Sequence, residues 1–248
     1  MVSNLVSNRE ILMVDSGAHS LRALASQARG LEYRVVTVKT PEGAHAVLVD
    51  PRHDVGAAVI TPDMPASSLA GAVAALRELA SHPRLPVLAV GRRGDTTVSR
   101  QALREAGVDL ALADPMDEHT LRFQLNRALA DTQGPEKERR YLRVPADWPV
   151  RMRVGSREKE ARLYSVSAAG AYLATDRPVV RNAIVYLTLP LPGGSVTTTA
   201  RVVMTNVPGN LKRTNLPLGM GVRFTGTPEE TSRAIEAFAR ARHQHLVI

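Results

Sequence analysis

Residues 139–143 read Arg-Arg-Tyr-Leu-Arg, and residues 165–170 read Ser-Val-Ser-Ala-Ala-Gly. Arg139 and Arg143 are separated by about one helical turn, or by one tight bend. Arginine can grip a phosphate with two parallel hydrogen bonds, and its planar face can stack on a base. The second stretch adds hydroxyls and a glycine, which leaves room for a ligand to approach the backbone. The two stretches therefore suit a compact ligand that carries phosphates and base edges.

This pair of motifs resembles the PilZ family, receptors for the bacterial second messenger cyclic di-GMP. The family pattern is Arg-x-x-x-Arg, followed by Asp or Asn-x-Ser-x-x-Gly. Four of the five positions match, and Ser165 stands where the family has a carboxylate or an amide. The resemblance implies that the arginines hold the phosphates and stack on guanine, while the second motif meets the base edge. The expected cyclic di-GMP site consists of Arg139, Arg140, Arg143, Ser165, Ser167 and Gly170.

Ser165 leaves two interpretations open. A serine hydroxyl makes fewer hydrogen bonds to a base edge than a carboxylate, and a base edge left unpaired costs about 1–3 kcal/mol, roughly ten- to hundredfold in affinity. Either the domain binds cyclic di-GMP, or it is a protein-interaction scaffold of the same fold that has lost the ligand. Replacing Ser165 by aspartate distinguishes the two, because tight binding gained only by the variant favours the scaffold.

Charge is unevenly distributed along the 248 residues. Residues 1–134 carry 14 Lys and Arg against 15 Asp and Glu, a net charge of −1, whereas residues 135–248 carry 18 against 9, a net charge of +9. A basic half favours an anionic partner. A nucleotide fits better than nucleic acid, because this half has few aromatic side chains for stacking and no recognisable helix-turn-helix or zinc module.

The composition also narrows the class of protein. There is no cysteine, which excludes disulfides and thiolate metal sites. No export signal and no run of about 18 apolar residues occurs, so we expect a cytoplasmic protein without a membrane span. Phosphate loops, nucleophile elbows and paired-carboxylate motifs are missing, and His243 and His245 have no acidic neighbour in sequence. We therefore expect no enzyme, no metal site and no cofactor. Cyclic di-GMP is the ligand that the resemblance implies.

Short apolar runs alternate with helical segments through the first half. Within residues 67–81, for example, Leu69, Val73 and Leu76 recur at helical spacing. The alternation predicts a doubly wound α/β domain with a five-stranded parallel sheet. The five expected strands are Ile11–Val14, Tyr33–Val38, Ala57–Ile60, Val87–Val90 and Leu110–Leu112.

The order of these elements resembles the receiver domain of bacterial response regulators over residues 8–131. In that family, adjacent acids and an acceptor aspartate bind Mg²⁺, and a lysine and a Ser or Thr stabilise the phosphorylated product. Here Asp15 is followed by Ser16, and the acceptor, hydroxyl and lysine positions hold Thr61, Gly91 and Asp114. Asp63 lies two residues beyond the acceptor position, so it does not replace the missing aspartate. The sequence predicts a pseudo-receiver that is not phosphorylated.

The polar stretch 131–138, with Gly134-Pro135 at its middle, predicts a domain boundary. We assign residues 1–131 to the pseudo-receiver, 132–137 to a linker and 138–248 to a PilZ-like domain. The β-branched runs beyond the boundary predict an antiparallel six-stranded barrel, and Thr227 is expected to cap a closing helix. The strands expected there include Trp148–Val154, Ala171–Leu173, Ala183–Leu189, Val196–Met204 and Met220–Phe224.

Taken together, the sequence predicts a non-enzymatic bacterial signalling adaptor. Its PilZ-like domain binds cyclic di-GMP and relays this to an unidentified protein partner, for example in motility or surface-polysaccharide machinery. The resemblance to receivers implies that the first domain docks a partner or forms a homodimer.

Overall fold

The chain divides into two compact units, which the computed structural model describes over residues 9–15, 21–61, 66–81, 84–92, 99–114, 116–131, 141–211 and 215–247. The first unit comprises Met1–Lys137 together with His245–Ile248, and the second comprises Glu138–Gln244. The sequence placed residues 245–248 in the second domain, whereas the structure groups them with the first unit, where Val247 bridges to Leu110 of β5. The predicted linker, residues 132–137, lies outside the described residues.

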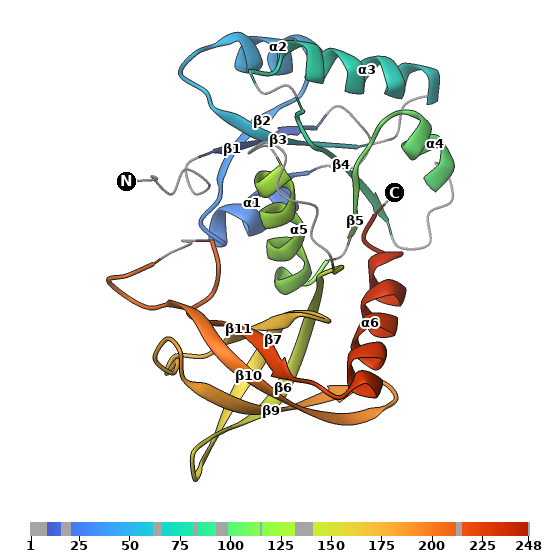
Figure 1. The fold of residues 1–248 in the computed structure, drawn as a ribbon. Coiled ribbons are helices and arrows are strands. Elements are labelled where there is room, and N and C mark those ends of the chain that lie inside the picture. The colour runs from blue at the N-terminus through green and yellow to red at the C-terminus, as the bar shows by residue number, and fades with distance from the viewer. Residues whose placement is uncertain are drawn as a thin grey trace. The chain divides into compact units, whose positions relative to one another are not determined.

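The first unit is a parallel sheet with helices on both faces, as predicted (Figure 1). Its five strands lie in the order β2-β1-β3-β4-β5. The strands are β1 (Glu10–Val14), β2 (Arg34–Val38), β3 (Val55–Ile60), β4 (Val87–Arg92) and β5 (Leu110–Asp114). The helices are α1 (Arg22–Gly30), α2 (Pro41–Val49), α3 (Ala66–Leu79), α4 (Arg100–Glu105) and α5 (Glu118–Asp131).

Two apolar clusters sandwich this sheet, because successive side chains of a strand point to opposite faces. In β1, Ile11 and Met13 join a buried cluster with residues of α1 and α5. Leu12 and Val14 join a second cluster with residues of α2, α3 and α4. A strand with apolar side chains on both faces is therefore buried on both, which explains the uninterrupted apolar run of β1 in the sequence.

The second unit is a closed barrel of six strands in the order β10-β11-β8-β7-β6-β9, followed by a helix. This confirms the predicted barrel and closing helix. Its neighbouring strands pair antiparallel. The strands are β6 (Val144–Val154), β7 (Arg157–Ser167), β8 (Gly170–Ala174), β9 (Ile184–Leu191), β10 (Gly194–Asn206) and β11 (Gly219–Gly226).

The closing helix α6 (Glu229–His243) packs on the barrel through an apolar face. Ile235 and Ala239 are buried, and the Phe238 ring lies 4.7 Å from the Trp148 ring, measured between centroids. The predicted threonine cap is wrong. Pro228 occupies the N-cap position and makes no side-chain hydrogen bond to the helix. The Thr227 hydroxyl instead lies 2.5 Å from the Thr198 hydroxyl of β10, which takes it away from the helix terminus.

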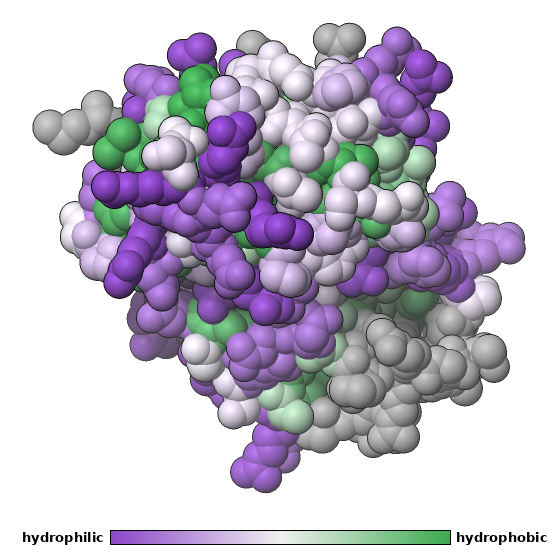
Figure 2. Space-filling model, turned by 90° about the horizontal axis from the view of Figure 1, so that it is seen from below, coloured by the Kyte–Doolittle hydropathy of each residue, from purple (hydrophilic) through white to green (hydrophobic). Residues whose placement is uncertain are grey.

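Hydrophilic side chains cover much of the face drawn in Figure 2, and the apolar ones lie among them in small groups. Large apolar side chains that are exposed, such as Val180 and Leu211, come from separate segments of the chain. Scattered exposed apolar residues are ordinary for a protein surface. Among the helices that the structure describes, none has both the length and the apolar character needed to cross a bilayer.

Candidate ligand-binding site

Arg143 of the first motif lies next to the serines of the second. It stands immediately before β6, and the antiparallel pairing of Pro145 with Ser165 brings the start of β6 beside the end of β7. The guanidinium donates from Nη1 to the Ser165 hydroxyl, at 3.1 Å, and to the Ser165 carbonyl, at 3.4 Å. From Nη2 it donates to the Ser167 hydroxyl at 3.5 Å. Two motifs that are far apart in the sequence therefore form one cluster.

The second motif is a β-hairpin rather than a free loop. Ser165 and Ser167 lie at the end of β7 and are buried, each 3% exposed, and Gly170 begins β8. Ser167 pairs with Gly170 across the hairpin, and its hydroxyl donates to the Gly170 carbonyl at 3.2 Å. Because these contacts hold the hairpin, the serines are positioned by the barrel itself before any ligand arrives.

The structure gives a reason for glycine at position 170 that differs from the one expected from the sequence. The sequence assigned it to the close approach of a ligand. In the structure its φ lies outside the left-handed region, and a Cβ on Gly170 would lie 2.2 Å from the Val222 carbonyl oxygen of β11. Such a contact is far inside van der Waals distance. Glycine is required here because two strands of the barrel approach closely.

The arrangement offers a cation beside hydroxyl groups. Arg143 is half-buried, and the arginine fork has five N–H donors, so the side chain can exchange its serine contacts for a phosphate. Ser165, in place of the family's carboxylate or amide, uses its hydroxyl to accept from Arg143. Arg139 and Arg140, the other arginines of the expected site, lie outside the described residues.

Arg223 is a further basic residue at this hairpin that the sequence analysis did not single out. It is exposed, and its backbone pairs with Gly170 in the register of β11 and β8. In the sequence it was read only as part of the strand Met220–Phe224. An arginine inside an otherwise apolar strand could have indicated a functional residue. Its position next to Gly170 could not be predicted, because that position depends on the pairing of β11 with β8 in the closed barrel.

The carboxyl ends of the parallel strands carry the degenerate receiver positions. Asp15 follows β1, and Thr61 follows β3 with 1% of its surface exposed. Within the part of the chain that the structure describes, the Thr61 hydroxyl has no hydrogen-bond partner. Gly91 lies in β4, where a Cβ would meet no atom within 4 Å. Asp63 lies outside the described residues.

The barrel also carries a groove of about 360 Å³ that does not include the arginine and serine motifs. Its walls come from β6, β9 and β10, and the Arg153 guanidinium lies 4.5 Å from the centre of the Tyr186 ring there. Across the described residues, no group of three or more His, Cys, Asp or Glu side chains could hold a metal ion.

A family model described as PilZ domain matches residues 137–241. Among solved structures, the inhibitor of motility MotI/DgrA of Bacillus subtilis is 20% identical, with a TM-score of 0.35, over 44% of this chain and 53% of that chain. PlzA of Borreliella burgdorferi, solved in complex with c-di-GMP, is 11% identical, with a TM-score of 0.31, over 50% of each chain. This chain therefore spans about half the length of those two proteins.

A further solved structure is similar over a comparable share of the chain. The chemotaxis protein CheY4 of Vibrio cholerae is 19% identical, with a TM-score of 0.40, over 48% of this chain and 98% of that chain. Among curated proteins, no match to the chain is found.

Proposed function

Since the chain consists of a receiver-like domain followed by a PilZ domain at residues 137–241, we propose that it is a non-enzymatic adaptor that binds cyclic di-GMP. The PilZ domain takes the dinucleotide, and the receiver-like domain is the side that meets a protein partner or a second copy. We place this activity in the cytoplasm, where a bacterial second messenger acts.

The observation that carries the proposal is the cluster of Arg143 with Ser165 and Ser167. A guanidinium that already lies at the end of a rigid hairpin loses little conformational entropy when it grips a phosphate. In the proposed complex, Arg143 and Arg139 hold the phosphates and stack on guanine, and Arg140 adds a contact. Ser165, Ser167 and Gly170 form the floor beneath the base.

We also propose that the receiver-like domain does not accept phosphate. The acceptor position holds Thr61, which is buried. An acceptor carboxylate, a second metal-binding acid and a lysine are all absent from the corresponding positions of the sequence. Without several carboxylate oxygens a hard cation such as Mg²⁺ is poorly held, and phosphoryl transfer loses its main charge stabilisation. Incubation with acetyl phosphate and Mg²⁺ should leave the mass of the intact protein unchanged.

Calorimetric titration with cyclic di-GMP tests the binding proposal. We expect micromolar or tighter binding by the intact chain. Loss of charged hydrogen bonds from Arg143→Ala should weaken it by tenfold or more, and the double variant Arg139→Ala, Arg143→Ala should abolish measurable heat. Arg157→Ala is the matched control, because Arg157 is an exposed arginine at the start of β7, whereas Ser165 and Ser167 lie at the end of that strand. Equal loss in the control would show a general charge effect and contradict the proposed site.

A second candidate function is a PilZ-fold scaffold that no longer binds the dinucleotide. One observation favours it, because the Ser165 hydroxyl is buried and engaged by Arg143 rather than presented to a base. Under this alternative the intact chain gives no heat with cyclic di-GMP, whereas Ser165→Asp gains binding. Circular dichroism of both proteins must show a folded barrel for the comparison to count. Binding by the intact chain rejects the scaffold.

A further inference from the structure

The last residues of the chain extend the sheet of the first unit. Val247 forms an antiparallel bridge with Leu110, the first residue of β5, and packs against the apolar cluster of that face. Leu246 is buried, with 4% of its surface exposed. In Figure 1 the red end of the chain lies beside β5. We call residues 245–247 the tail, and it occupies the outer edge of β5.

A buried amide holds the tail. Gln124 of α5 is fully buried, and its Nε2 donates to the Leu246 carbonyl at 2.7 Å and to the Ala111 carbonyl of β5 at 3.1 Å. The two donors of one amide therefore join the sheet to the tail. Arg100 of α4 adds an exposed hydrogen bond to the His245 carbonyl at 3.4 Å. The hydrogen bonds from Gln124 and Arg100 to the tail both go to backbone carbonyls, those of Leu246 and His245.

The position of β5 in the sheet explains why the tail is held there. β5 is an edge strand, since the sheet order ends with it. An edge strand presents unpaired N–H and C=O groups that another extended segment can pair with. If the tail left, the Gln124 amide would lose an acceptor in a buried place, which is unfavourable unless another carbonyl replaces it. The outer edge of β5 is therefore suited to pairing with an extended segment.

We propose that the outer edge of β5, with Gln124 at its floor, is a strand-addition site for an extended apolar peptide segment of a partner protein. The tail is the internal occupant that such a segment displaces. The recognised features are a backbone carbonyl that accepts from Gln124 and an apolar side chain in the place of Leu246. A second apolar side chain follows in the place of Val247. This inference goes beyond the proposed function and does not depend on dinucleotide binding.

The tail competes with any added peptide for the same site. We therefore expect peptide binding to become tighter when the tail is weakened. Because the tail and its site belong to the same chain, the tail binds intramolecularly, and an added peptide has to exceed the effective concentration of the tail to displace it. An added peptide should therefore bind the intact chain weakly. A full-length Leu246→Asp chain should have an open site, because a carboxylate is costly in the place of a buried leucine.

The probe is a fluorescent peptide of residues 243–248, His-Gln-His-Leu-Val-Ile, followed by anisotropy. We expect it to bind the Leu246→Asp chain at least tenfold more tightly than the intact chain. Adding Gln124→Leu to that chain should remove the binding. Gln27→Leu should not, although it deletes an amide of the same kind, which donates to Met116 in the same unit. A peptide with aspartate in place of its leucine should bind none of these proteins.

Two results would overturn the site as a whole, and a third would overturn the role of Gln124 in it. One is failure of the peptide to bind a Leu246→Asp chain whose circular dichroism shows a folded protein. The other is an intact chain that is dimeric in light scattering and becomes monomeric with Leu246→Asp, because the tail would then be exchanged between copies instead of covering its own β5. Peptide binding that survives Gln124→Leu would also contradict the assigned floor of the site.

Discussion

Position 170 has no room for a side chain, so a substitution there tests the close contact between β8 and β11. A Cβ there would lie 2.2 Å from the Val222 carbonyl, so Gly170→Ala must push β8 and β11 apart. We expect it to lower the free energy of unfolding of the second unit by about 1–3 kcal/mol or more, as overpacked positions do. Gly193→Ala is the control, because a Cβ at Gly193 meets no atom within 4 Å. Equal effects in urea denaturation would contradict the strand contact.

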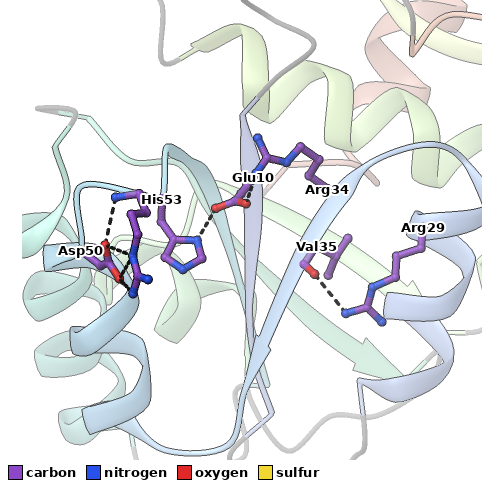
Figure 3. A network of polar contacts seen from close by, with 7 residues as sticks. Glu10, Arg29, Arg34, Val35, Asp50 and His53 are labelled. Atoms are coloured by element: carbon purple, nitrogen blue, oxygen red, sulfur yellow. Dashed lines mark hydrogen bonds and ion pairs between the residues drawn. The ribbon is translucent and has the colours of Figure 1, made fainter.

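The first unit contains a buried carboxylate with two partners (Figure 3). Glu10 accepts from Arg34 at 2.6 Å with one oxygen, and its other oxygen lies 2.6 Å from His53 Nδ1. Glu10→Ala removes the buried carboxylate that contacts both Arg34 and His53, and we expect the free energy of unfolding of this unit to fall by about 1–3 kcal/mol. Asp50→Ala removes the exposed pair with Arg52 and should shift the urea midpoint far less. A larger effect of Asp50→Ala would refute this ranking.

At the scale of single residues, the motif resemblance predicted that the two motifs lie close together, but not which strand contacts bring them there. It placed Arg143 beside Ser165, Ser167 and Gly170, and the structure brings these four together. The sequence did not reveal the structural reason for Gly170, because the atom that excludes a side chain belongs to β11, more than 50 residues away in sequence. Its role toward a ligand stays a prediction. Arg139 and Arg140 stay predictions.

At the scale of elements, the start of α5 carries a pH-sensitive cap. Asp117 precedes the helix and accepts from the Thr120 backbone N–H at 2.7 Å and from the Thr120 hydroxyl at 2.9 Å. Burial raises the pKa of Asp117, but these hydrogen bonds outweigh burial and lower the pKa below its ordinary value. The folded protein therefore gains stability above the unfolded pKa of about 4, and loses it as pH falls through the lower folded pKa.

Asp117→Asn tests this cap, because asparagine also caps helices but does not titrate. We expect the intact chain to be more stable than the variant at neutral pH, and the difference to vanish as the pH drops below about 4. Asp117→Ala should cost about 0.5–2 kcal/mol at neutral pH by losing the cap altogether. Urea denaturation at several pH values gives the measurement. Parallel pH profiles for the intact chain and Asp117→Asn would show that this carboxylate does not contribute.

Most strands could be predicted because they are rich in β-branched and apolar residues, but β7 escaped. Its first four residues, Arg157–Glu160, are all charged, so neither hydrophobic alternation nor strand propensity indicated a strand there. The strand forms because β6 lies opposite, and the register sets Arg151 against Glu160 and Arg153 against Glu158. Opposite charges across antiparallel strands favour pairing. Such a strand depends on its partner, which a local pattern cannot reveal.

At the scale of the whole molecule, division into two units was predictable and the place of the chain end was not. Composition and charge change near Gly134, and the two hydrophobic patterns differ on either side. Nothing local in His-Leu-Val at 245–247 indicates pairing with a strand that ends more than 130 residues earlier. A contact of this kind depends on an unpaired sheet edge, which exists only once the sheet has formed.

Because the chain has two units, an unfolding experiment can show which of them binds a ligand. A ligand that binds one folded unit stabilises that unit, by about 2.7 kcal/mol when its concentration is 100 times the Kd. Under the proposed function, cyclic di-GMP should raise the unfolding temperature of Glu138–Gln244 and leave that of the sheet unit unchanged. In calorimetric scans, Gly170→Ala identifies the barrel transition and Glu10→Ala the sheet transition, since each variant lowers only its own. An increase confined to the sheet transition would contradict binding at the hairpin, whereas no increase in either would support the scaffold that has lost the dinucleotide.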